Sequence, residues 1–285
     1  TIGGAWMQST GRDSPCYNPY STAPASAHIL WKVTTGMGGL IGGEYGATAY
    51  SSSAPSKVIM YGRAYFAASD GVHCVDVHTG EELWVPPKTM GSGTMFALPG
   101  PTPYIWRIGS SRFERFDAFT GASTKNVTGQ PSGAALAPLQ GSTSWRMNRQ
   151  WMDSNGILYI NIDDVLERFV GTLAYDTKVS STNFYAGVMW HLQRESMNST
   201  NVHLYNYPYG NATAVIVKNY TMPLQDLANM AVDTENDIIF HSSNGGRYTA
   251  AIDAKTGELL WNKEQEGYFE GQGVAMNGVG SCGAE

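Results

Sequence analysis

The amino-acid sequence predicts an all-β protein built from repeated four-stranded antiparallel units, and three observations favour this fold class. Only 15% of the 285 residues are charged, against roughly a quarter in an average globular domain. The chain has 33 glycines and 12% aromatic residues, a combination typical of β structure because tight turns need glycine and pleated surfaces pack aromatic side chains. The third observation is an internal repeat that ends in an Asp-x-x-Thr-Gly turn and a tryptophan.

The repeat is clearest near each end of the chain. Residues 64–67 and 72–75 are apolar segments of strand length, separated by a Ser-Asp-Gly turn. Residues 238–240 and 248–252 show the same arrangement around a Gly-rich turn. Each pair of predicted strands leads directly into the same turn and tryptophan, formed by Asp76, Thr79, Gly80 and Trp84 in one copy and by Asp253, Thr256, Gly257 and Trp261 in the other.

Weaker copies lie between these two. Residues 104–106 and 113–116 lead to Asp117, Thr120 and Gly121, without a tryptophan at the expected spacing. Strands are also predicted over residues 157–160 and 173–175, ahead of Asp176, and over residues 202–206, which end at Asn206. The aspartate-like positions are about 44 residues apart on average, close to the length of a four-stranded propeller blade.

The repeated turn has a clear physical role. Aspartate and threonine side chains bond to nearby backbone groups, and the following glycine can adopt a positive φ, so the segment closes a compact hairpin. The tryptophan on the next short strand can then cover a neighbouring unit. Since one unit cannot bury its own faces, several must stack, and a closed ring removes the exposed sheet edges.

With these motifs the sequence resembles the PQQ-like, or quinoprotein-type, β-propellers, whose blades carry a tryptophan-docking signature of this form. Residues 6–20 and 30–32 are also similar to the opening region of secreted members, notably archaeal surface proteins. The resemblance implies one β-propeller domain over residues 1–285, with about six to eight four-stranded blades and an incomplete ring. Residues 1–32 would form an opening segment and a closing strand, with Trp31 at a docking position, and residues 271–285 would begin an unfinished blade.

The resemblance allows two functions of different classes. One is a non-catalytic extracellular propeller that acts as a scaffold for protein or glycan contacts, as a subunit of a cell-surface assembly or filament. The other is a PQQ- and calcium-dependent quinoprotein dehydrogenase, but many members of that branch have adjacent cysteines that form a disulfide, and no Cys-Cys pair is present here. Asn161, Asp163 and Asp164 could supply oxygen ligands to a hard cation, although a solvated acidic turn is the simpler interpretation. We expect no enzymatic activity, cofactor or metal.

Other chemistry-bearing residues show no catalytic pattern. The six histidines lack metal-ligand spacing, and no serine lies in a Gly-x-Ser-x-Gly context. Cys16, Cys74 and Cys282 are far apart in the sequence and can form at most one intramolecular disulfide.

Charge and sequons point outside the cytoplasm. A net charge of −6 without a basic cluster argues against nucleic acid as a partner, and no apolar run approaches the roughly 18 to 20 residues of a membrane span. Asn-x-Ser/Thr sequons predict an extracellular or cell-surface glycoprotein. The candidate glycosylation sites are Asn126, Asn198, Asn211 and Asn219.

Aromatic residues supply the candidate interaction surface. Trp84 and Trp261 are expected to dock blades, whereas Trp106 and Trp190 have no assigned role. One aromatic-basic cluster is a candidate for protein or glycan partners, or for self-association, with a strand pair of alternating faces as the alternative interpretation. Its residues are Trp145, Arg146, Arg149 and Trp151.

Overall fold

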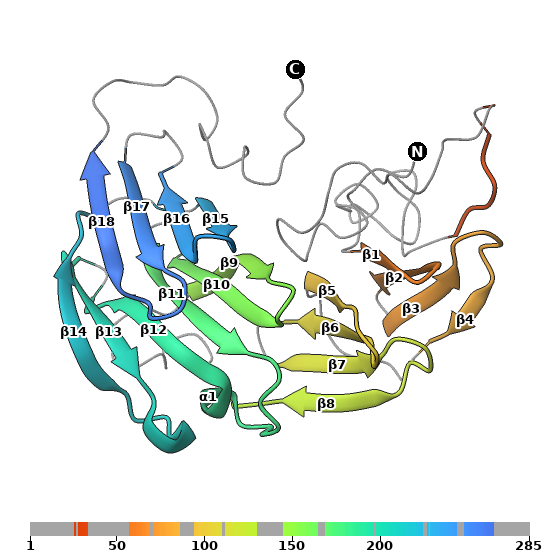
Figure 1. Ribbon diagram of the computed structural model, residues 1–285, viewed down its shortest axis with the longest axis horizontal. Coiled ribbons are helices and arrows are strands. Elements are labelled where there is room, and N and C mark those ends of the chain that lie inside the picture. Colours follow the sequence, from red (N-terminus) through yellow and green to blue (C-terminus); the bar gives the residue numbers. More distant parts are fainter. Residues whose placement is uncertain are drawn as a thin grey trace, which may run out of the picture. The chain divides into compact units, whose positions relative to one another are not determined.

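The computed structural model consists almost entirely of antiparallel sheets (Figure 1). Its strands fall into two compact units along the chain, and each unit is described by itself. The residues that the structure describes are 26, 28–33, 57–68, 71–85, 94–109, 112–129, 145–164, 169–196, 198–224, 227, 229–243 and 248–264.

The first unit contains two four-stranded sheets in which each strand pairs with the next one in sequence. Short turns join these strands, so the sheets are simple meanders. The first sheet comprises β1 (Lys57–Met60), β2 (Arg63–Ala68), β3 (Gly71–Asp76) and β4 (Glu82–Trp84). The second comprises β5 (Thr94–Leu98), β6 (Tyr104–Ile108), β7 (Phe113–Asp117) and β8 (Ser123–Val127), whose last residue is grouped with the second unit.

The second unit contains a six-stranded sheet and a further four-stranded meander. The six strands are β9 (Trp145–Met152), β10 (Ile157–Asp164), β11 (Phe169–Asp176), β12 (Val188–Arg194), β13 (Asn201–Asn206) and β14 (Val215–Thr221). A short helix, α1 (Phe184–Gly187), precedes β12, and a 3-10 turn, η3 (Pro208–Gly210), follows β13. The last meander comprises β15 (Asn229–Asp233), β16 (Ile238–Ser242), β17 (Tyr248–Asp253) and β18 (Leu259–Glu264).

Each unit has its own hydrophobic core between two sheets. In the first unit Tyr65 and Cys74 of one sheet pack with Met95 and Phe116 of the other. In the second unit Trp190 and Leu192 pack with Ile239 and Ile252. Apolar strand faces are thus removed from water by the neighbouring sheet, which is the largest favourable term in folding.

The all-β prediction with four-stranded antiparallel units is confirmed. One assignment within it is wrong: residues 202–206 do not begin a separate unit, because β13 pairs with β12 in the same sheet as β11. Asn206 therefore marks a hairpin added to the sheet that already contains Asp176. The expectation of one domain over residues 1–285 stays a prediction, and residues 1–25 and 265–285, with the unfinished blade expected there, lie outside the described part.

Candidate functional site: the turn and tryptophan contacts and the exposed sheet edge

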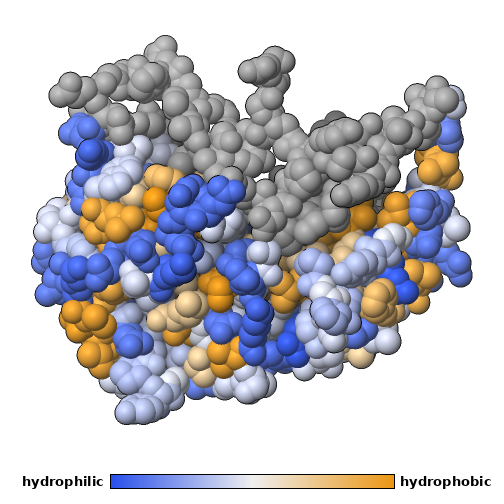
Figure 2. Space-filling model, viewed as in Figure 1, coloured by the Kyte–Doolittle hydropathy of each residue, from blue (hydrophilic) through white to orange (hydrophobic). Residues whose placement is uncertain are grey.

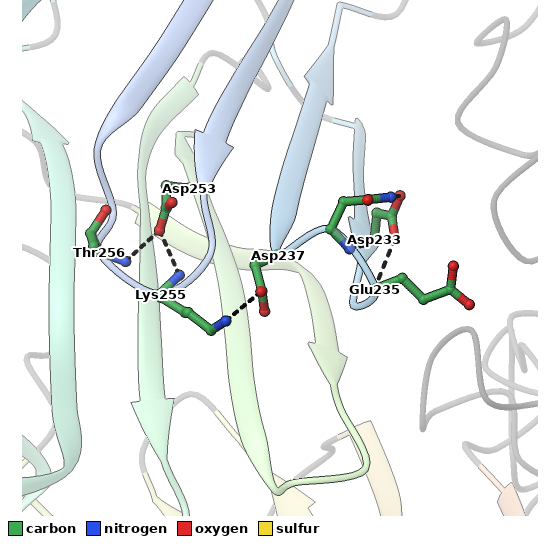
Figure 3. Close-up of polar contacts among 7 residues, drawn as sticks. Asp233, Glu235, Asp237, Asp253, Lys255 and Thr256 are labelled. Atoms are coloured by element: carbon green, nitrogen blue, oxygen red, sulfur yellow. Dashed lines mark hydrogen bonds and ion pairs between the residues drawn. The ribbon is translucent and has the colours of Figure 1, made fainter.

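Three turns have the same hydrogen bonds, set by one aspartate each. The Oδ1 atom of Asp76 accepts the backbone N–H groups of His78 at 2.8 Å and Thr79 at 2.9 Å. The N–H of Gly80 donates to the carbonyl of Asp76 at 2.9 Å. Asp117 and Asp253 accept the corresponding N–H groups, and Figure 3 shows Asp253 with those of Lys255 and Thr256.

These hydrogen bonds stabilise the ionised aspartate. The N–H groups of Thr79 and His78 lower the pKa of Asp76, and the N–H of Thr120 lowers the pKa of Asp117. Both carboxylates therefore remain charged acceptors over the physiological range, which keeps the turns closed.

Three tryptophans contact these turns with one geometry. The indole N–H of Trp31 donates to the carbonyl of Val77 at 2.7 Å, that of Trp84 to Ala118 at 3.3 Å and that of Trp190 to Ala254 at 3.0 Å. In every case the acceptor is the residue after the aspartate. Each tryptophan thus donates a hydrogen bond to a backbone carbonyl whose position is fixed by the turn.

Glycine is required because the indole ring lies directly over it. A Cβ atom on Gly80, Gly121 or Gly257 would lie within 2.8 Å of ring or Cβ atoms of the docked tryptophan. All three glycines have φ between 72° and 75°, a region that other residues rarely occupy. The predicted docking residues Asp76, Thr79, Gly80, Trp84, Asp117, Thr120, Gly121, Asp253, Thr256 and Gly257 all lie in these contacts.

The role of Trp190 was not recognised in the sequence because it lies 14 residues after Asp176, whereas Trp84 lies 8 after Asp76. The additional residues between Asp176 and Trp190 include the short helix α1. The sequence does contain a local signal for this role, because an apolar residue directly precedes each of Trp84, Trp190 and Trp261. Leu83, Met189 and Leu260 are the extra residues at β-bulges, with exposed fractions of 38%, 41% and 48%.

The second sheet has a cation where the others have tryptophan. Lys125, 8 residues after Asp117, is buried, and its Nζ lies 5.6 Å from the ring centre of Trp106. Arg115 also approaches this ring, which is itself fully buried. Trp106 is thus a core residue of the β5–β8 sheet.

The possible hard-cation ligands are not in an acidic turn. Asn161 and Asp163 belong to β10 and are fully buried, so the expectation of a solvated turn is wrong. The amide of Asn161 donates to the carbonyl of Leu227 at 3.5 Å. Within the described ranges, no three His, Cys, Asp or Glu side chains are grouped so that they could hold a metal ion.

Cys74 is a buried free thiol in β3, whereas Cys16 and Cys282 lie outside the described residues. Burial raises the pKa of Cys74 to about 11, and Arg63 offsets this only in part. The thiol is therefore a packing group, not a nucleophile.

The aromatic-basic cluster is only partly described. The backbone of β9 pairs Arg146 with Asp163 and Arg149 with Asn161. Trp151 is half-buried and packs against the core of the second unit. The side chains of Trp145, Arg146 and Arg149 lie outside the described part.

The outer edge of the six-stranded sheet exposes apolar residues. β14 is the edge strand, and Val215, Ile216 and Val217 are 50%, 50% and 61% exposed. Figure 2 shows hydrophobic surface at the left of the view, over β14 and β18. Two sequon asparagines flank this run, and the four candidates, Asn126, Asn198, Asn211 and Asn219, are all exposed.

The meander order of these sheets and the repeated tryptophan contact define the class: the chain is a β-propeller protein. No family model and no curated protein matches the sequence. Among solved structures, the chain is similar to Hsv2p of Kluyveromyces lactis (10% identity, TM-score 0.35), a europium-containing methanol dehydrogenase (14%, 0.34) and BamB from Moraxella catarrhalis (15%, 0.35). These matches cover 71%, 73% and 71% of this chain and 60%, 41% and 61% of the others, so this chain spans less than two thirds of each.

Proposed function

We propose that this chain is a PQQ-like propeller that acts as a non-catalytic scaffold for protein or glycan partners at the cell surface. The observation that carries the proposal is the edge strand β14, on which three consecutive apolar residues, Val215 to Val217, are at least half exposed. An edge strand offers unpaired backbone groups, and exposed apolar side chains on such a strand are typical of a protein-binding surface.

Sequons support the extracellular part of the proposal. Asn211 and Asn219 lie on either side of the apolar run, and both side chains are exposed. Glycans at these positions would bracket the edge and limit unspecific strand pairing. In the part of the chain that the structure describes, no helix has the length and hydropathy for a membrane span.

Site-specific photo-crosslinking in the native source tests the scaffold role. A photoreactive amino acid at Ile216 is expected to capture a defined protein, whereas the same group at Leu83, which is 38% exposed in the first unit, serves as the matched control. With the photoreactive amino acid kept at position 216, the additional substitution Val217→Asp should abolish the captured product without changing the far-ultraviolet circular dichroism. No product at position 216, or the same products from both positions, would contradict the proposal.

Two further measurements test the compartment and the absence of catalysis. Mass spectrometry of native material is expected to find glycans at Asn211 and Asn219, and finding all four sequons unmodified would oppose the extracellular assignment. Reconstitution with PQQ and calcium is expected to give neither stoichiometric cofactor nor substrate-dependent dye reduction. A positive result would instead establish the dehydrogenase.

A further inference from the structure

Two exposed aromatic rings meet on the first unit, at turns that join its strands. Tyr61 lies in the turn between β1 and β2 and is 55% exposed, and Phe119 lies in the turn between β7 and β8 and is 46% exposed. Their ring centres are 6.0 Å apart, with an angle of 34° between the ring planes. Exposed apolar residues usually lie singly on a protein surface, so a contacting pair of rings from two different turns needs an explanation.

The equivalent positions of the other sheets have polar residues. Phe119 is the second residue after the turn aspartate. The other turns have His78, Lys178 and Lys255 at this position. Tyr61 precedes the residue whose carbonyl accepts the N–H of the residue after the turn aspartate. The other sheets have Thr102, Asn155 and Asn236 there, and all three are exposed. The repeat therefore does not need an aromatic residue at either position.

Tyr61 occupies its position with a strained backbone. Its φ is 51°, in the left-handed region, and that of Gly62 is 73°. Hairpin turns with two consecutive positive φ values prefer Asn-Gly, because a residue with a bulky side chain is unfavourable at the first of them. Strained residues are concentrated at ligand-binding and switch positions, so Tyr61 is a candidate binding residue.

Hydrogen bonds hold both rings in place. The backbone N–H of Gly100 donates to the hydroxyl of Tyr61 at 3.2 Å. Arg63 donates from Nη1 to the carbonyl of Phe119 at 2.8 Å, and its Cζ atom lies 4.9 Å from the centre of the Phe119 ring. A surface that is fixed before a ligand arrives loses less conformational entropy on binding.

The chemistry of this surface fits a sugar better than other common partners. Aromatic rings attract the C–H groups of a sugar ring, while a phenol hydroxyl and a guanidinium can hydrogen-bond to its hydroxyl groups. A partner strand would need an unpaired strand edge, whereas both aromatic residues lie in turns. Nucleic acid or an anionic membrane would need a cluster of cations, but the net charge of the chain is −6.

We propose that Tyr61, Arg63 and Phe119 form a binding site for a sugar ring of a glycan. The two aromatic rings stack on the C–H groups of the sugar, and Arg63 and the hydroxyl of Tyr61 bind its hydroxyl groups. This inference rests on the proposed scaffold function and deepens it by naming a glycan as the partner, on a different surface from β14.

Titration of the 285-residue protein with cellohexaose, chitohexaose and mannohexaose tests the site, with saturation-transfer difference NMR as the readout. We expect saturable transfer to the protons of at least one of these sugars. Phe119→Lys introduces the residue found at this position in two other turns, and Tyr61→Asn introduces a residue that tolerates a positive φ. Each variant should bind at least about tenfold more weakly, with unchanged far-ultraviolet circular dichroism.

Tyr209→Asn is the matched control, because Tyr209 is a fully exposed tyrosine with φ of 58° in the second unit. This variant should bind the sugar as the unsubstituted protein does. No saturable transfer to any of the three sugars at millimolar concentration would overturn the proposal, and so would equal binding by all three variants.

A proline-rich peptide is a further probe, since aromatic surfaces also bind such segments. Peptide binding that depends on Tyr61, without sugar binding, would overturn the proposal and assign the surface to a protein. Crosslinking from Ile216 reports on β14 and does not depend on these titrations. Failure of the sugar site and failure of the scaffold function are therefore separate results.

Discussion

Gly121→Ala tests whether the contact between turn and tryptophan stabilises the first unit. The added Cβ would lie 2.6 Å from Cδ2 and Cε3 of Trp84, at a residue with φ of 72°. The left-handed backbone costs about 1 to 2 kcal/mol for a residue with a Cβ. Overpacking against the ring adds about 1 to 3 kcal/mol, because either the indole or the turn must move. The expected loss in the free energy of unfolding is therefore about 2 to 5 kcal/mol.

Gly62→Ala is a matched control in the same unit. Gly62 has φ of 73°, but no atom lies within 4 Å of an added Cβ. This variant should lose only the backbone cost, about 1 to 2 kcal/mol. The difference between the two variants isolates the contact with Trp84.

Urea unfolding followed by circular dichroism measures both variants, with equal slopes expected because the surface exposed on unfolding is the same. In a Trp84→Ala background the two glycine substitutions should become equivalent, since the clashing ring is gone. Equal unfolding midpoints for Gly121→Ala and Gly62→Ala with Trp84 present would refute the reasoning.

Three further predictions concern buried groups. Burial lowers the pKa of His191 from its usual 6.5 to about 3. The free energy of unfolding should therefore fall as pH drops below about 6.5, by up to about 1.4 kcal/mol per pH unit, because only the unfolded chain binds the proton. Urea titrations at several pH values should give a flatter pH dependence for His191→Phe, and parallel curves would contradict this. Cys74 in a Cys16→Ser/Cys282→Ser background should react with a thiol reagent only after unfolding, and fast labelling of the native protein would oppose its assignment as a packing residue. Glu114→Gln should cost about 3 to 5 kcal/mol in urea unfolding, because it leaves the buried guanidinium of Arg107 without its ion pair, and an unchanged midpoint would show that the pair contributes little.

The docking turns could be predicted from the sequence because their chemistry is local. Asp76 bonds to backbone groups two and three residues away, so a short sequence pattern contains the whole turn. The partner of each tryptophan could not be predicted. The contact between Trp84 and Ala118 spans 34 residues, and only the packing of two sheets brings them together.

Two departures from the repeat were hidden for different reasons. The insertion before Trp190 removed the regular spacing, although the preceding apolar residue, Met189, kept the bulge that aims the tryptophan. The hairpin of β13 and β14 followed the strand pattern of a new repeat, and only the pairing with β12 shows that it extends the existing sheet. Periodicity identifies strands, but it does not say which sheet a strand joins.

The acceptor of each docked tryptophan is a main-chain carbonyl, and this has a consequence for how such a protein can diverge. Val77 contributes the same group as Ala118 and Ala254 although its side chain is different, so this position can change without loss of the contact. Only the tryptophan, the glycine and the residues that close the turn carry a specific chemical requirement. Two propellers can therefore share this joint between blades while having few identical residues, and a whole blade can be replaced by another that presents the same backbone group.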